Sequence, residues 1–154
     1  MPHPIDARLA ELGLTLPEAP APAANYVPFV SLGNQLFVSG QISQGPDGLI
    51  TGKLGENLTV AEGAVAAKHC ALSLLAQARA ACGGDWSRLV RVVKLTGFVN
   101  CTPDFNDQPR VINGASDLIV ELLGEAGRHA RSAVGVSSLP LGVAVEIEAV
   151  FELR

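Results

Sequence analysis

The C-terminal segment ARSAVGVSSLPLGVAVEIEAVFE, residues 130–152, has the most regular polarity pattern of the chain. From residue 143 onward the odd positions are apolar, and three of the even positions carry glutamate. Because the side chains of a strand alternate between its two faces, this pattern predicts a strand over 143–153 whose odd positions face the core. A second strand is predicted over 130–137, and residues 138–142, which include a proline and a glycine, are expected to join the two strands.

Pairing these two strands as an antiparallel hairpin gives Arg131 a defined neighbour. If Val134 and Val136 face the core, Arg131 lies on the opposite face. Directly opposed residues share a face, so Arg131 is expected across from Glu146 or Glu148, with Cβ atoms roughly 5 Å apart. A guanidinium held in this way offers paired donors to a small carboxylate, and the second glutamate is free to position a water or a proton. The competing interpretation is an ordinary cross-strand ion pair on a solvated face.

Residues 89–99 are predicted to form a strand that is buried on both faces. Apolar side chains occupy both alternating sets of positions: Leu89, Val93, Leu95 and Val99 in one set, and Val90, Val92 and Phe98 in the other. A strand that is apolar on both sides has to be covered on both sides.

One helix is predicted before this strand in the sequence and another after it. Residues 60–82 are rich in alanine and free of proline; Thr59 is expected to cap this helix, Glu62 to complete a capping box, and two glycines to end it. Residues 113–123 are predicted to form a second helix, which also ends at a glycine.

The N-terminal part is predicted to contain a short helix over 5–13, a proline-rich extended connector over 17–28, a β-hairpin, and a long exposed loop over 43–59. The hairpin pairs 27–32 with 35–38 across Gly33-Asn34, because both of these turn residues tolerate positive φ.

The resulting order, ββ–α–β–α–ββ, is that of an α+β fold with one sheet. Two substantial helices cover one face of a sheet, whereas the central strand is apolar on both of its faces. A partner subunit is therefore expected to cover the second face. The alternative is that the short N-terminal helix folds over it.

Composition limits the classes of function. The 154 residues are 48% apolar and 17% charged, which excludes a disordered chain. No apolar run approaches the roughly 20 residues of a membrane span, and the N-terminus lacks the pattern of a secretory signal, so a cytoplasmic location is expected. The net charge of −4 and the lack of a Lys/Arg cluster disfavour nucleic-acid binding. Neither a disulfide nor a metal site is predicted, because the required spacing is absent from the three cysteines (Cys70, Cys82 and Cys101) and from the three scattered histidines.

Three segments together resemble the RidA/YjgF family. Residues 130–152 are similar to its C-terminal signature, in which an Arg-Ser pair is followed by Leu-Pro and by apolar residues that alternate with glutamates. NYVPFVSLGNQLFVSGQIS, residues 25–43, resembles its N-terminal hairpin, and VINGASDLIVELLG, residues 111–124, resembles its asparagine-bearing helix. The likeness covers 24–154 as one domain, preceded by a helix and connector over 1–23.

The resemblance implies a chorismate-mutase-like fold, in which a homotrimer holds three clefts between its subunits. It also implies hydrolysis of reactive 2-imino or 2-enamino acids to 2-oxo acids and ammonia, without a cofactor. By position, Arg131 would bind the substrate carboxylate and Glu146 would orient or activate the attacking water. The remaining cleft residues implied are Tyr26, Ser39, Gly40, Asn113 and Ala133.

The sequence departs from the family pattern in three places. Ala133 stands where relatives often carry cysteine, so no thiol is expected to be essential; the N-terminal extension and the 43–59 loop are longer and indicate a long-chain branch. Taken singly, Asn113 also fits the start of a helix, Tyr26 the edge of a hairpin, and Ser39-Gly40 the end of a strand.

Three other functions stay open at this point. The first is non-enzymatic binding of small carboxylates, the second is endoribonuclease activity, and the third is chorismate mutation, which rests on fold analogy alone.

Overall fold

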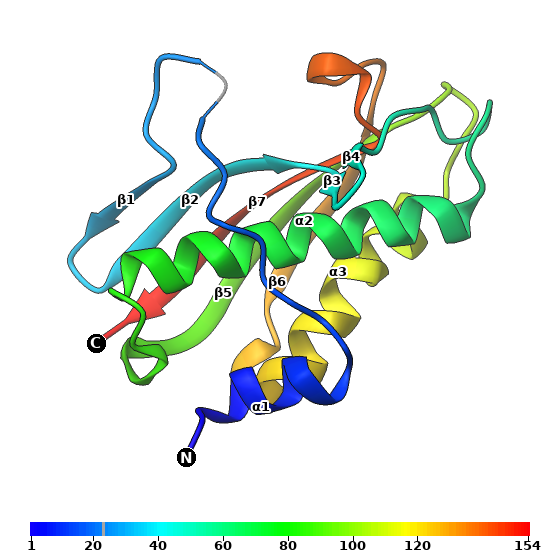
Figure 1. The fold of residues 1–154 in the computed structure, drawn as a ribbon. Coiled ribbons are helices and arrows are strands. Elements are labelled where there is room, and N and C mark those ends of the chain that lie inside the picture. The colour runs from blue at the N-terminus through cyan, green and yellow to red at the C-terminus, as the bar shows by residue number, and fades with distance from the viewer. Residues whose placement is uncertain (23) are drawn as a thin grey trace.

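The structure is a computed structural model that describes residues 1–22 and 24–154 (Figure 1). Its helices are α1 (Pro4–Glu11), α2 (Val60–Ala81) and α3 (Gln108–Leu123). Its strands are β1 (Phe29–Leu32), β2 (Gln35–Ile42), β3 (Gln44–Gly45), β4 (Gly48–Leu49), β5 (Leu89–Asn100), β6 (Ala130–Val136) and β7 (Val145–Leu153). Within the described ranges, no helix has the length and apolar character that crossing a bilayer requires.

Five strands form one mixed sheet in the order β1-β2-β7-β5-β6. The predicted hairpin between 130–137 and 143–153 is wrong, because β5 lies between β6 and β7 and pairs with both of them. β6 runs parallel to β5 at the sheet edge, with Arg131 beside Leu95. The link from β6 to β7 has to cross only about 10 Å, two strand spacings, which a few residues can span. β7 is the middle strand of the five, and β5 lies between it and the edge strand β6, so residues 89–99 do not form the central strand as predicted.

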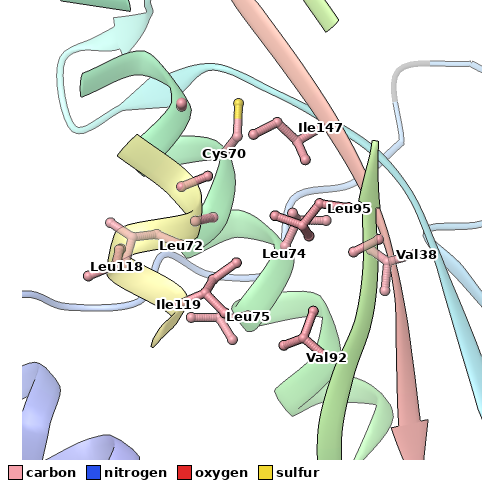
Figure 2. Packing of buried hydrophobic residues seen from close by; sticks show 14 of the residues in the cluster. Val38, Cys70, Leu72, Leu74, Leu75, Val92, Leu95, Leu118, Ile119 and Ile147 are labelled. Carbon is pink, nitrogen blue, oxygen red and sulfur yellow. The ribbon is translucent and has the colours of Figure 1, made fainter. Parts of the chain in front are cut away.

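The helices α2 and α3 pack side by side on one face of the sheet. Thr59 and Glu62 form the predicted capping box at the start of α2, with N–H···O distances of 3.2 and 3.0 Å. Figure 2 shows Leu74 and Leu75 of α2 and Ile119 of α3 packed against side chains of the sheet. The buried cluster also takes in all three cysteines, as free thiols.

The predicted face assignment within residues 89–99 is partly wrong. β5 contains irregular steps between Leu89 and Arg91 and between Val92 and Lys94, where the register against β7 shifts. Such bulges reverse the alternation of the residues that follow them. Val92 is therefore fully buried under the helices, and Val93, which simple alternation places on the same face as Leu95, is 40% exposed.

α3 begins five residues before the predicted start, with Pro109 in its first turn, where the fixed φ of proline favours a helix. Asn113 is consequently an exposed residue within the helix rather than its first residue.

The segment 43–59 is less exposed than predicted. It contains the small β3–β4 hairpin, and Ser43 and Leu54 in it are fully buried. The Ser43 hydroxyl donates to the Ile50 carbonyl at 2.8 Å, which satisfies the polar group inside the core.

The N-terminal helix does not cover the second face of the sheet. α1 lies against α3 in the helical layer, where Arg8 pairs with Glu121 at 2.6 Å and the Trp86 indole donates to Asp6 at 3.0 Å (Figure 1). In the described part of the chain, no helix covers the opposite face. That face exposes a set of large apolar side chains, namely Val30, Leu32, Phe37 and Val134.

Candidate functional site

The seven residues predicted to form the site fall into two groups on opposite faces of the sheet. Tyr26, Ser39, Gly40 and Glu146 lie around β2 and β7, whereas Arg131, Asn113 and Ala133 lie around β6 and α3.

Glu146 is half-buried in a cavity of ≈ 520 Å³ on the open face, together with Tyr26 and Gly40. A Cβ on Gly40 would lie 2.2 Å from Glu146 Oε2, so a glycine is needed for the carboxylate to occupy this place. Burial, and secondarily the neighbouring charge of Glu148, raises the pKa of Glu146. A carboxyl with a raised pKa exchanges protons more readily near neutrality, which suits a general acid or base.

The other walls of this cavity are mostly apolar and come largely from the N-terminal connector, at Pro20, Pro22 and Pro28. Gln77 of α2, which is 1% exposed, donates to the Pro20 carbonyl at 2.7 Å and so fixes the connector against α2. The Ser39 hydroxyl donates to the Val27 carbonyl at 2.8 Å, which holds the segment that carries Tyr26. Ser39 and Gly40 lie inside β2, next to its register shift, and not at its end.

Arg131 lies on the helix-covered face and is held by neutral groups of α3. Its guanidinium donates to Ser116 Oγ and to the Pro109 carbonyl, both at 3.0 Å. Pro109, Asn113 and Ser116 share one side of α3, so Asn113 lies along the same stripe as the guanidinium. Ala133 follows two residues later on the same face of β6. No carboxylate pairs with Arg131 among residues 1–22 and 24–154, so its charge is available to an anion.

The predicted position of Arg131 across from Glu146 is therefore wrong. Arg131 aligns with Leu95, which pairs with Ala149, three residues along β7 from Glu146. Two strand spacings and three residues place the Cα atoms of Arg131 and Glu146 about 14 Å apart, and the two side chains point to opposite faces. One chain cannot bring both groups to the same small substrate.

Ser116 is a site residue that the sequence reasoning did not identify. The carbonyl of Gly127 can only accept, so His129 Nδ1, 2.6 Å away, carries the ring proton. His129 Nε2 then accepts from Ser116 Oγ at 2.9 Å, which leaves a lone pair of that hydroxyl for Arg131. Burial is the main cause that lowers the pKa of His129, which keeps the ring neutral. Ser116 lies three residues after Asn113, but this spacing has meaning only once the position of Arg131 is known.

Comparison with known proteins identifies the family. The family model described as "YjgF/chorismate_mutase-like, putative endoribonuclease" matches residues 6–152. Protein TCP17 of Trypanosoma cruzi is 54% identical over 97% of this chain and 94% of its own length. The 2-iminobutanoate/2-iminopropanoate deaminase of Dermatophagoides farinae is 27% identical over 89% of this chain and 92% of its own.

Two solved structures extend the comparison. The protein Atu1372 from Agrobacterium tumefaciens, of unknown function, superimposes with a TM-score of 0.92 at 51% identity, covering 98% of this chain and 93% of that one. TdcF of E. coli with bound serine gives a TM-score of 0.62 at 29% identity, covering 89% and 94%. The sheet, the helical layer and these matches agree, and the chain belongs to the YjgF/RidA family, with its α+β chorismate-mutase-like fold.

Proposed function

We propose that this protein hydrolyses small 2-imino or 2-enamino acids to 2-oxo acids and ammonia, at clefts where neighbouring subunits of a homotrimer meet. The observation that carries the proposal is the division of the site. An arginine that pairs with no carboxylate of the described residues, and a half-buried glutamate with a raised pKa, lie on opposite faces of one sheet, so a second copy is needed to complete either half.

The open face of the sheet supports the assembly. It exposes Phe37 and Val134 on the same face as the cavity-lining Glu146, and a large apolar patch on a protein surface marks an interaction site. A neighbouring copy seated there would bury the patch and bring its own β6 edge toward the Glu146 cavity. Two members of the family support the substrate class: the mite relative is named for imine deamination, and the bacterial structure holds serine, a small α-amino acid.

In the proposed reaction Arg131 binds the substrate carboxylate through the N–H donors that Ser116 and Pro109 leave free. Glu146 takes a proton from water as the water oxygen adds to the iminium carbon. The same carboxyl returns this proton to the amine nitrogen and then takes up the hydroxyl proton of the intermediate. The C=O bond forms as the C–N bond breaks, so ammonia leaves, the 2-oxo acid remains, and the carboxyl passes its proton to the solvent. The iminium carbon is already electrophilic, so fixing the carboxylate and the water in position provides much of the acceleration.

The direct test measures 2-oxo acid release from an imino acid generated in place by an amino-acid oxidase, with semicarbazide as competing trap. Arg131→Ala should lower kcat/KM by about ten- to a hundredfold, since it removes a charged hydrogen-bond partner. Glu146→Gln should lower kcat by about a hundredfold or more. Arg110→Ala, which changes an exposed arginine of α3, the helix that holds the Arg131 side chain, is the matched control and should keep the wild-type rate.

Equal release by wild type and Arg131→Ala contradicts the proposal. Saturable binding of 2-oxobutanoate without turnover favours a carboxylate-binding protein instead. RNA cleavage that survives purification and disappears in Arg131→Ala favours the endoribonuclease.

The assembly is tested by light scattering after size exclusion. A homotrimer has three times the 16.0 kDa mass of the chain. Val134→Asp on the open face should give a folded, inactive species of lower mass, because it places a charge in the apolar patch.

A further inference from the structure

A second cavity, of ≈ 560 Å³, lies between α2, the β3–β4 hairpin and the N-terminal connector. The two cavities share Pro20 and Gln44, but neither Glu146 nor Gly40 lines the second one. Figure 1 shows the connector crossing over α2, and this crossing forms the roof of the second cavity. A volume of several hundred Å³ is the usual size of a small-molecule site.

Two polar side chains from α2 line this cavity without partners. His69 and Ser73 are four residues apart and therefore share one side of the helix. Ser73 is 2% exposed, and no hydrogen bond of its hydroxyl is found in the described ranges; since no side-chain oxygen or nitrogen there is both fully enclosed and without a partner, this hydroxyl opens onto the cavity that it lines. The imidazole of His69 lies against Gly45, where an added Cβ would be 3.6 Å from the ring, and it likewise makes no hydrogen bond within those ranges.

A hydroxyl that opens onto a cavity finds its hydrogen-bond partner in the molecule that occupies the cavity. Because Ser73 lines the cavity, the cavity is where such a molecule would lie. The hydroxyl and the imidazole together offer both a donor and an acceptor to one polar group of a ligand.

The other walls define the rest of the ligand. They are formed mostly by Leu14, Leu16, Pro17, Pro46 and Leu72, which fit an apolar body. Burial, and secondarily Lys68, lowers the pKa of His69, so the ring is neutral near pH 7. Among the described lining residues Glu18 alone is charged, and its carboxylate disfavours an anion.

We infer that this cavity is a second binding site, for small uncharged molecules with an apolar body and one hydroxyl group, the chemistry of a simple phenol. The site is independent of imine hydrolysis, and its test needs no enzymatic activity.

The experiment titrates the full chain with p-cresol and, in parallel, with toluene, which has the same ring and methyl group without the hydroxyl. Two-dimensional amide NMR reports the site. Saturable shifts are expected at 13–18, 44–46 and 69–73, with toluene bound at least about fivefold more weakly, the effect of one lost hydrogen bond.

Ser73→Ala should weaken p-cresol binding about fivefold and leave toluene binding unchanged. Ser87→Ala, at an exposed serine outside the cavity, is the matched control and should behave as wild type. Absence of saturable shifts up to the solubility of p-cresol overturns the inference, since water then serves the hydroxyl. Equal affinity for the two probes also overturns it, and this comparison needs only the wild-type chain, whatever the stability of the Ser73 variant.

Discussion

Mixing two inactive variants should restore activity if each cleft takes Arg131 from one subunit and Glu146 from its neighbour. Arg131→Ala subunits keep Glu146, and Glu146→Gln subunits keep Arg131. In a mixed ring, an interface is intact wherever an Arg131→Ala subunit supplies the glutamate and a Glu146→Gln subunit supplies the arginine. The separation of about 14 Å and the opposite faces within one chain make the within-chain alternative geometrically impossible.

The expected magnitude follows from random assembly. In an equimolar mixture the subunit that supplies the arginine carries an intact Arg131 with a chance of one half, and the subunit that supplies the glutamate carries an intact Glu146 with the same chance. About one quarter of the clefts are therefore intact, and about a quarter of the wild-type rate returns. The mixture is prepared by co-expression, and oxo-acid release is measured per subunit.

A second mixture sharpens the test. Wild type mixed in equal amounts with the Arg131→Ala, Glu146→Gln double variant should also retain about one quarter of the activity if clefts form between subunits, and about one half if each chain carries a complete site. A mixture of single variants that stays inactive while mixed rings are present would refute the division of the site between subunits.

Three further predictions concern single groups. Gly40→Ala places a Cβ against Glu146 Oε2 and should lower kcat by displacing the carboxylate, while circular dichroism shows the fold unchanged. Glu146→Gln should raise the unfolding free energy at pH 7 by about 0.2–1 kcal/mol in urea denaturation, because it removes a charge that burial disfavours and that Glu148 repels. The gain should vanish in acid, where Glu146 is protonated in both states. The pKa of His129 is lowered in the folded chain, so the stability that its neutral ring contributes is complete above the pKa of the unfolded chain and is lost as the pH falls. In urea denaturation, His129→Gln should therefore lose less unfolding free energy between pH 7 and pH 5 than the wild type does.

The elements of this fold could be predicted from the sequence, but their neighbours could not. Thr59 and Glu62 act through contacts three residues apart, so the start of α2 is visible in the sequence. Strand pairing is a long-range property: the alternation in 143–153 fixes which side chains share a face, but it does not state whether β6 or β5 lies alongside. The bulges of β5 are also invisible to a period-two pattern, and they exchange the exposures of Val92 and Val93.

The same limit explains why the candidate site was only partly foreseen. The resemblance to the family assigned Arg131 and Glu146 to one cleft. The predicted hairpin also placed them together, but the sheet order contradicts that hairpin. The assignment to one cleft and the observed sheet order are compatible if Arg131 of one copy meets Glu146 of another. The apolar side chains that would hold the copies together, Phe37 and Val134 among them, share their face with Glu146. Burial of that face would then drive assembly and complete the site in one step. Dilution below the dissociation constant of the proposed trimer should therefore abolish turnover and assembly together.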